Sequence, residues 1–200
     1  MKISTIRISA VAVVAFIVSG CAPQSYFRAA NDVVAVNAPD RMKGDWTYSI
    51  DDSIKDARRS NFKPGGHPCS LHTYSIDAGV ALDSAIRKAM QEFLENGAEK
   101  KSASDAKRHI AFRLESYQPR FSCAIGQVEG HCTGTAEIAL GITVVRGDDR
   151  KSFTVSSERT ADAAGGNMCA GALDAPAEAS RKAAKDVVER AMERVLTALK

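Results

Sequence analysis

The sequence predicts an α+β fold, a two-layer sandwich in which a four-stranded sheet carries two long helices on one face. Four segments alternate apolar and polar residues with the two-residue period of a strand, and two longer segments repeat apolar residues at the helical period. Their order is β-α-β-β-β-α. Each strand has one apolar face, so one antiparallel or mixed sheet should bury that face under both helices. In chain order, the segments are residues 44–50, 77–96, 110–115, 135–144, 153–156 and 174–200.

The first strand and the first helix have clear patterns. In the strand, Trp46, Tyr48 and Ile50 alternate with polar neighbours, and we expect Trp46 to lie in the core. The polar residues 51–70 are predicted to form a loop. The apolar face of the helix consists of Leu82, Ile86, Ala89, Met90 and Phe93.

The later segments complete the sandwich. Residues 146–150 are predicted to be the turn of a hairpin between the third and fourth strands. The last helix has an apolar stripe made of Ala184, Val187, Val188, Ala191, Val195 and Leu199. The sheet face away from the helices should meet water, and it includes Thr47, Arg113, Glu115, Glu137, Thr143 and Thr154. On that face we interpret three charged residues as candidates for binding a partner protein: Arg113, Glu115 and Glu137.

The first 21 residues have the pattern of a signal peptide that ends at a cysteine. Lys2 and Arg7 begin it, and the apolar run 8–18 is too short to span a bilayer. The small residues 19–20 then precede Cys21. This pattern resembles the lipobox of bacterial lipoproteins. The resemblance implies cleavage before Cys21 and attachment of lipid to its sulfur, with acylation of its amine.

The lipobox resemblance, together with the prolines and the lack of periodicity in residues 22–43, predicts a domain organisation and an address. Residues 1–20 would be the signal peptide, residues 21–43 a lipidated N-terminus with a flexible tether, and residues 44–200 a single α+β domain. In this family, an aspartate after the lipidated cysteine favours retention at the inner membrane. Ala22 occupies that position here. The resemblance therefore implies a lipid anchor in the outer membrane, with the domain facing the periplasm; exposure at the cell surface is the alternative.

Composition narrows the range of partners. The chain has 27 basic and 24 acidic side chains, and removal of Lys2 and Arg7 with the signal peptide leaves 25 basic ones. A mature charge near zero argues against nucleic acid as a partner and against a polybasic membrane patch. We therefore expect attachment to the membrane through the lipid anchor.

Cysteine usage fits an exported protein. Once Cys21 is assigned to lipid, four cysteines remain, and an even number in an exported chain favours two disulfides. Tracing the polarity of the predicted elements places all four at one end of the domain. The preferred pairing is Cys123–Cys132 with Cys69–Cys169, and the crossed pairing Cys69–Cys123 with Cys132–Cys169 stays open.

Three histidines map to the same end of the domain as the cysteines: His67, His72 and His131. Together with Cys69 and Cys132 they offer suitable ligands for zinc. Their spacing, however, is not the paired C-x-x-C pattern, and an oxidising compartment would consume the thiols. We therefore predict disulfides and no metal.

The sequence does not indicate an enzyme. It contains no G-x-S-x-G, H-E-x-x-H or Walker-type motif, and no cofactor is expected. His109, at the start of a predicted strand, is interpreted as a structural edge residue. In outline, the lipobox, tether and two helices on a sheet resemble small envelope lipoproteins of the YajG, LpoB and transport-auxiliary types. The resemblance by itself carries no function. The lipid anchor, the tether and the lack of a catalytic motif instead favour a non-catalytic accessory lipoprotein that binds another envelope protein and supports assembly or transport. The alternative is a small-molecule or lipid-binding lipoprotein of a transport system.

Overall fold

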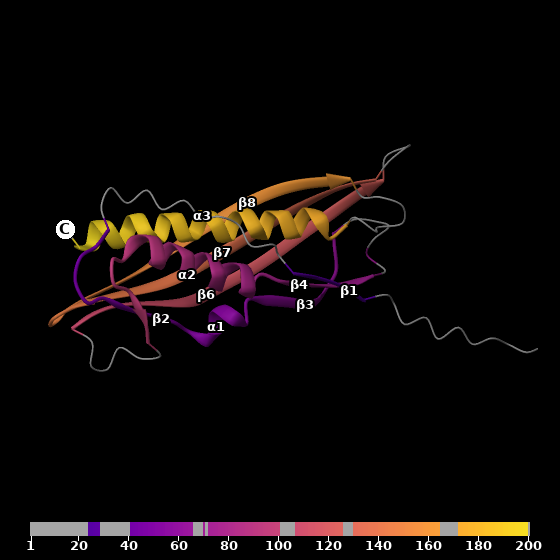
Figure 1. Cartoon of the computed structure of the whole chain (residues 1–200). Helices are drawn as coiled ribbons and strands as arrows, with labels where there is room; N and C mark the ends of the chain where they lie inside the picture. The colour runs from indigo at the N-terminus through magenta and orange to yellow at the C-terminus, as the bar shows by residue number, and fades with distance from the viewer. Residues whose placement is uncertain are drawn as a thin grey trace, which may run out of the picture.

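Three long antiparallel strands form the framework of the fold (Figure 1). The computed structural model describes residues 24–28, 41–65, 70, 72–100, 107–125, 130–164 and 172–199. The long strands are β6 (Arg108–Ile125), β7 (Gly130–Arg146) and β8 (Asp149–Ala164). With β2 (Thr47–Ile50) and β5 (Ala98–Glu99) they make a mixed sheet of order β5-β2-β6-β7-β8. β2 runs parallel to β6, and the turn Gly147-Asp148 joins β7 to β8 at the predicted hairpin.

The prediction of a four-stranded sheet under two long helices is wrong. The main sheet has five strands, because the two residues of β5 pair in parallel with β2. Only α3 (Asp174–Leu199) is long, with 26 residues, whereas α2 (Gly79–Phe93) has 15. The sequence pattern of the first helix was followed to residue 96, but Leu94 already has an extended backbone.

A second, smaller sheet was also missed. It has the order β1-β4-β3, from β1 (Gln24–Arg28), β3 (Arg58–Phe62) and β4 (Thr73–Asp77), and α1 (Asp52–Lys55) precedes β3. The predicted loop 51–70 thus contains a helix and a strand. All residues of β3 except the last are exposed, so the strand has no apolar alternation that its sequence could display.

β6 is longer than the predicted strand 110–115, and its extension includes Pro119. Proline has no backbone N–H and usually marks the end or the edge of a sheet. In β6, pairing with β2 ends at the contact of Ile50 with Phe112, so the side of β6 beyond that point is an edge for several residues. Pro119 lies within this edge segment, where it remains opposite Ala136 of β7. The strand therefore continues to Ile125.

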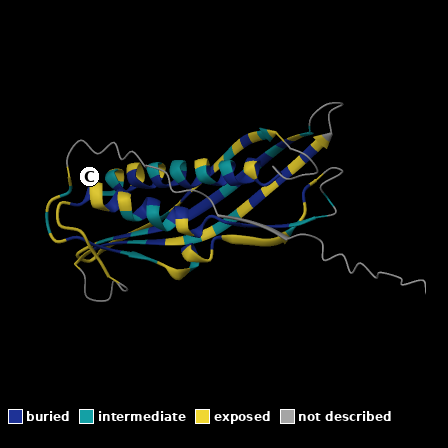
Figure 2. Cartoon of the chain, turned by 45° about the vertical axis from the view of Figure 1, so that its right-hand side comes forward, coloured by how far each residue is buried: buried dark blue, intermediate teal, exposed yellow. Residues whose placement is uncertain are grey.

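One face of the main sheet is buried under α2 and α3 (Figure 2). Trp46 and Tyr48 lie in this core, as the alternation of the first strand predicted. The largest fully buried side chains include Phe93, Phe112, Ile138, Leu140 and Ile142. The start of α3 lies directly against β7 at Gly134, since a Cβ on that glycine would be 2.5 Å from Pro176 Cα. This close approach positions α3 along β7 and β8.

Part of the N-terminal segment falls inside the structure. Residues 24–28, within the predicted tether, form β1, which pairs in parallel with β4. The predictions for residues 1–20, for Cys21 and for Ala22 lie outside the described residues. Among the helices that the structure describes, none is long and apolar enough to cross a membrane.

Candidate functional site

The face of β6, β7 and β8 that turns away from the helices is the first candidate surface, and we call it the open face. Alternation of side chains along each strand places hydroxyl and charged groups on it. Its members are Arg113, Glu115, Ser116, Gln118 and Arg120 on β6, Thr133, Thr135, Glu137 and Thr143 on β7, and Ser152, Thr154, Ser156, Glu158, Thr160 and Asp162 on β8. The open face is thus a long polar surface on three paired strands.

Hydrogen bonds across the strands order this surface. Thr133 Oγ1 donates to Asp162 Oδ1 at 2.7 Å. The hydroxyls of Thr143 and Ser152 lie 2.9 Å apart. The bond from Thr133 lowers the pKa of Asp162, so this carboxylate stays charged. Such cross-strand pairs limit the rotamers of exposed side chains, which favours a defined binding surface.

The structure places the three predicted partner-binding residues on the open face but does not gather them into one cluster. Arg113 Nε donates to Glu115 Oε1 at 2.6 Å, and this ion pair lies over Gly141 of β7. A side chain at position 141 would collide with both residues, so the glycine allows them to lie against the sheet. Glu137 is four residues away along β7, opposite Gln118 and Glu158.

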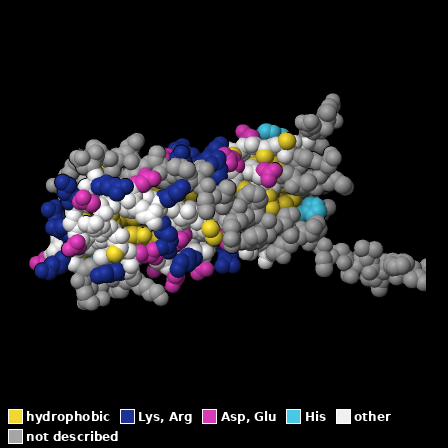
Figure 3. Space-filling model, viewed as in Figure 1, with side chains coloured by type: hydrophobic (Ala, Val, Ile, Leu, Met, Phe, Trp, Pro, Cys, Tyr) yellow, Lys and Arg dark blue, Asp and Glu magenta, His cyan; other side chains and the backbone are white. Residues whose placement is uncertain are grey.

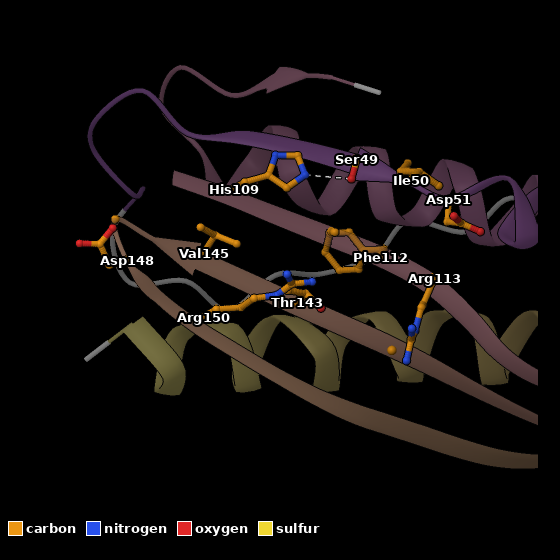
Figure 4. A pocket seen from close by; sticks show the side chains of 13 residues that line it. Ser49, Ile50, Asp51, His109, Phe112, Arg113, Thr143, Val145, Asp148 and Arg150 are labelled. Atoms are coloured by element: carbon orange, nitrogen blue, oxygen red, sulfur yellow. Dashed lines mark hydrogen bonds between the residues drawn. The ribbon is translucent and has the colours of Figure 1, made fainter. Parts of the chain in front are cut away.

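A groove crosses the open face near the β7–β8 turn, and we call it the His109 groove (Figure 4). Its volume is about 600 Å³. The groove exists because Ala111 and Gly141, which form its floor, have a small side chain and none. Figure 4 shows Arg150 extending from β8 toward Thr143. The remaining lining includes Ser49 and Asp51 at the end of β2, Arg113 of β6, and Val145 and Asp148 beside the turn.

His109 lies beneath this groove with both ring nitrogens bonded. Thr47 Oγ1 donates to the carbonyl of Arg108 at 3.2 Å, so it acts as the acceptor for His109 Nδ1, 2.7 Å away. Nδ1 therefore carries the proton, and Nε2 accepts from Ser49 Oγ at 2.9 Å. Burial lowers the pKa of His109. The interpretation of His109 as an edge residue is wrong. His109 lies on β6, which pairs with β2 on one side and β7 on the other, and its side chain is fully buried.

The hydrogen bonds that link Ser49, His109 and Thr47 follow the order of a nucleophile, a base and an orienting group. The orienting group, however, is a neutral hydroxyl that cannot stabilise an imidazolium as a carboxylate does. With the pKa of His109 already lowered by burial, transfer of the Ser49 proton to the ring is disfavoured. The arrangement is suited to holding Ser49 as a fixed hydrogen-bonding group in the groove wall.

The disulfide end of the domain is the second candidate surface. Cys123 and Cys132 face each other on β6 and β7 and form one of the two predicted bridges. Around it, a small apolar cluster includes Tyr74, whose ring stacks edge-on against Phe121 at 5.1 Å between centroids. This cluster joins the smaller sheet to the end of the main one.

Two of the three predicted histidines lie at this end. The ring of His72 is 6.3 Å from that of Tyr74, and His131 Nε2 is 3.4 Å from Asp162 Oδ1. Histidine side chains visible in Figure 3 lie at the end where β6 and β7 meet. His67, Cys69 and Cys169 lie outside the described residues, so the second bridge and the alternative pairing stay predictions. Within the part of the chain that is described, no three His, Cys, Asp or Glu residues are grouped as metal ligands would be.

Sequence reasoning missed the groove. Ser49, Arg113 and Arg150 belong to three different segments, and only the pairing of β2 with β6 and the β7–β8 turn brings them together. The period-2 pattern already placed Ser49 on the polar face. It carried no information about which strand would lie beside it.

No protein-family model matches the chain, and no curated protein matches it in sequence. Several solved structures resemble it. A Xanthomonas campestris protein of family DUF330 shares 15% identity with a TM-score of 0.49, over 86% of this chain and 94% of that one. A minor lipoprotein from Acinetobacter baumannii shares 7% identity with a TM-score of 0.39, over 76% and 91%. A candidate lipoprotein from Caulobacter crescentus CB15 shares 10% identity with a TM-score of 0.32, over 60% and 82%. At these values the similarities assign neither a family nor an activity.

Proposed function

We propose that the chain is a non-catalytic accessory lipoprotein of the bacterial envelope, which binds another envelope protein through its open face. The observation that carries the proposal is the open face itself. It extends over three paired strands, is ordered by cross-strand hydrogen bonds, and lies opposite the helices. The lipobox pattern ending at Cys21 supports an anchor in the outer membrane with the domain in the periplasm.

The hydrogen-bonding of His109 supports the non-catalytic part of the proposal. An imidazole whose Nδ1 donates to a hydroxyl, and whose pKa is lowered by burial, is a poor general base. A protein interface distributes its energy over a few packed contacts and does not need such a group. We therefore expect His109→Gln, in a folded protein, to leave partner binding largely intact.

Photo-crosslinking in intact envelopes tests the proposal. A photoreactive amino acid at Gln118 or Glu137, on the open face, should give a discrete adduct with one envelope protein. The matched control is the same amino acid at Lys185 of α3, which should give no such adduct. Charge reversal of Arg113 and Glu137 together should abolish the adduct from Gln118. Equal crosslinking from Gln118 and Lys185, or none from either, would contradict the assignment of the open face.

A second candidate function is the binding of a small polar molecule in the His109 groove. Its volume of about 600 Å³ is within the ~300–1,000 Å³ typical of ligand pockets. Asp51, Arg113, Asp148 and Arg150 line it, and such a charged lining favours a polar ligand over a lipid chain. Val145→Trp should fill the groove. If partner crosslinking survives this change while function in cells is lost, the groove and not the wider face carries the activity.

A further inference from the structure

The outer edge of β8 is open to pairing. β8 has 16 residues and ends the order β5-β2-β6-β7-β8, so no strand in the described part of the chain pairs with its outer side. In an antiparallel ladder, the N–H and C=O groups of alternate residues point to the same side. Every second residue of β8 therefore directs both groups away from β7. Such an edge is a template for one more strand.

The centre of this edge has no charge, proline or bulge in its own sequence. Natural edge strands are protected by charges, prolines or bulges. Residues 152–157 of β8 contain neither a charge nor a proline, and β8 pairs with β7 without a shift of register. Charged residues flank this stretch on both sides, at 149–151 and 158–159. The unprotected stretch is thus confined to the middle of the strand.

A contact from α3 identifies the backbone groups that point outward. Arg190 Nη1 donates to the carbonyl oxygen of Ser156 at 3.4 Å, so this oxygen is turned away from β7. By alternation, the backbone groups of Thr154 and Glu158 point the same way. An added strand would bond the outward groups of Thr154 and Glu158, and it would share or displace the contact of Arg190 with the Ser156 oxygen.

A groove runs beside this edge, between β8 and α3, and we call it the β8–α3 groove. Figure 1 shows α3 lying along β8. The groove has a volume of about 600 Å³ and is lined by Thr154, Val155, Ser156, Arg190, Glu193, Arg194 and Thr197. A strand edge flanked by a helix is the geometry in which an extended peptide binds by strand addition, with main-chain hydrogen bonds on one side and side-chain contacts on the other.

The groove is lined by charges of both signs, from Arg190, Glu193 and Arg194, and the two arginines differ in whether a carboxylate already holds them. Arg190 is held by Asp186, with Nε 2.8 Å from Oδ2. For Arg194, no ion pair with a carboxylate is found among the described residues, although it lines the same groove. An arginine in this position is suited to a carboxylate of the bound chain.

We propose that the β8–α3 groove binds an extended segment of a partner protein, which adds to β8 as a further strand and places one Asp or Glu side chain against Arg194. This surface is the edge of the sheet, and its use is independent of the open face.

The test uses the full chain in detergent micelles and two fluorescent peptides. Each peptide has about ten residues, enough to cover the unprotected stretch at ~3.3 Å per residue. Both alternate threonine and valine, one with a central glutamate and the other with a central lysine. Fluorescence anisotropy should show the glutamate peptide binding at least about tenfold more tightly. Arg194→Glu should invert this preference, whereas Lys185→Glu, the same charge change elsewhere on α3, should not.

A backbone variant tests strand addition itself. Thr154→Pro removes an outward N–H and leaves the ladder with β7 intact, because proline is tolerated on the open side of an edge strand. It should weaken binding of the glutamate peptide at least about tenfold, with an unchanged circular dichroism spectrum. Equal affinity for the two peptides, or full binding by Thr154→Pro, would overturn the proposal. Dimerisation of the chain that Thr154→Pro abolishes would instead assign the edge to a second copy. Arg113 and Glu137 variants should leave peptide binding unchanged, which separates this test from that of the open face.

Discussion

Gly134→Ala adds only a methyl group, but it should lower the free energy of unfolding clearly. On β7, Gly134 lies under the start of α3, and an added Cβ would be 2.5 Å from Pro176 Cα and closer still to Pro176 N and the Ala175 carbonyl carbon. These are backbone atoms, which cannot move aside as the end of a flexible side chain can. Favourable carbon contacts begin near ~3.5 Å, so the first turn of α3 would have to withdraw by about 1 Å.

The expected loss of unfolding free energy is about 1–3 kcal/mol, the usual range for overpacking of a well-packed core. Alanine would recover up to ~1 kcal/mol by restricting the unfolded chain, which places the net loss toward the lower part of that range. Gly65→Ala is the matched control. A Cβ at Gly65 would meet its nearest atom, Ser122 Cβ, at 3.7 Å, an ordinary contact, so its stability should stay within about 0.5 kcal/mol of wild type.

Urea denaturation followed by circular dichroism measures both changes under oxidising conditions. With a slope of ~2 kcal/mol per molar urea, a loss of about 2 kcal/mol lowers the midpoint of Gly134→Ala by about 1 M. If Gly134→Ala unfolded at the wild-type midpoint with the wild-type helical signal, α3 would not begin against β7. The description of the core, and with it that of the open face on the other side of the sheet, would then need revision.

Three further predictions concern pH, the disulfide and the contact between β8 and α3. Because burial lowers the pKa of folded His109, whereas the unfolded residue protonates near ~6.5, stability should fall as the pH drops below that value; titration of the unfolding midpoint should show a flatter dependence for His109→Gln. Replacing Cys123 and Cys132 by alanine should lower the free energy of unfolding by about 2.5 kcal/mol, as estimated from the entropy of the short loop that the bridge closes. In this variant, a reducing agent should no longer cause the loss of stability that comes from breaking this bridge. Asp186 accepts from Ser157 Oγ at 2.6 Å and pairs with Arg159, and these hydrogen bonds outweigh its burial and lower its pKa. Asp186→Ala should therefore cost about 1–2 kcal/mol and Glu137→Ala less than about 0.5 kcal/mol, and similar midpoints for the two would refute this difference.

The local periodicity of the sequence determined which side of each element is buried. The alternation around Trp46 and Tyr48 assigned them to the core, where both lie. The hairpin at residues 146–150 follows from a short polar segment between two alternating ones, and the structure has its turn there. The polarity of the elements placed the four cysteines at one end of the domain, and the preferred partner of Cys123, Cys132, is the one to which it is bonded. The two-residue and 3.6-residue periods report burial directly, because burial selects apolar side chains at those positions.

Tertiary structure decided what depends on neighbours in space. β3 is exposed along most of its length, so its residues carry no periodic signal and only its pairing with β4 reveals it. Pro119 is tolerated within β6, because the adjacent strand β2 has already ended. The His109 groove and the β8–α3 groove combine residues from segments far apart in the chain. A period encodes which face of a strand is buried, but the identity of its neighbours depends on long-range pairing. Many pairings satisfy the same local pattern, and the packing of the whole chain selects among them.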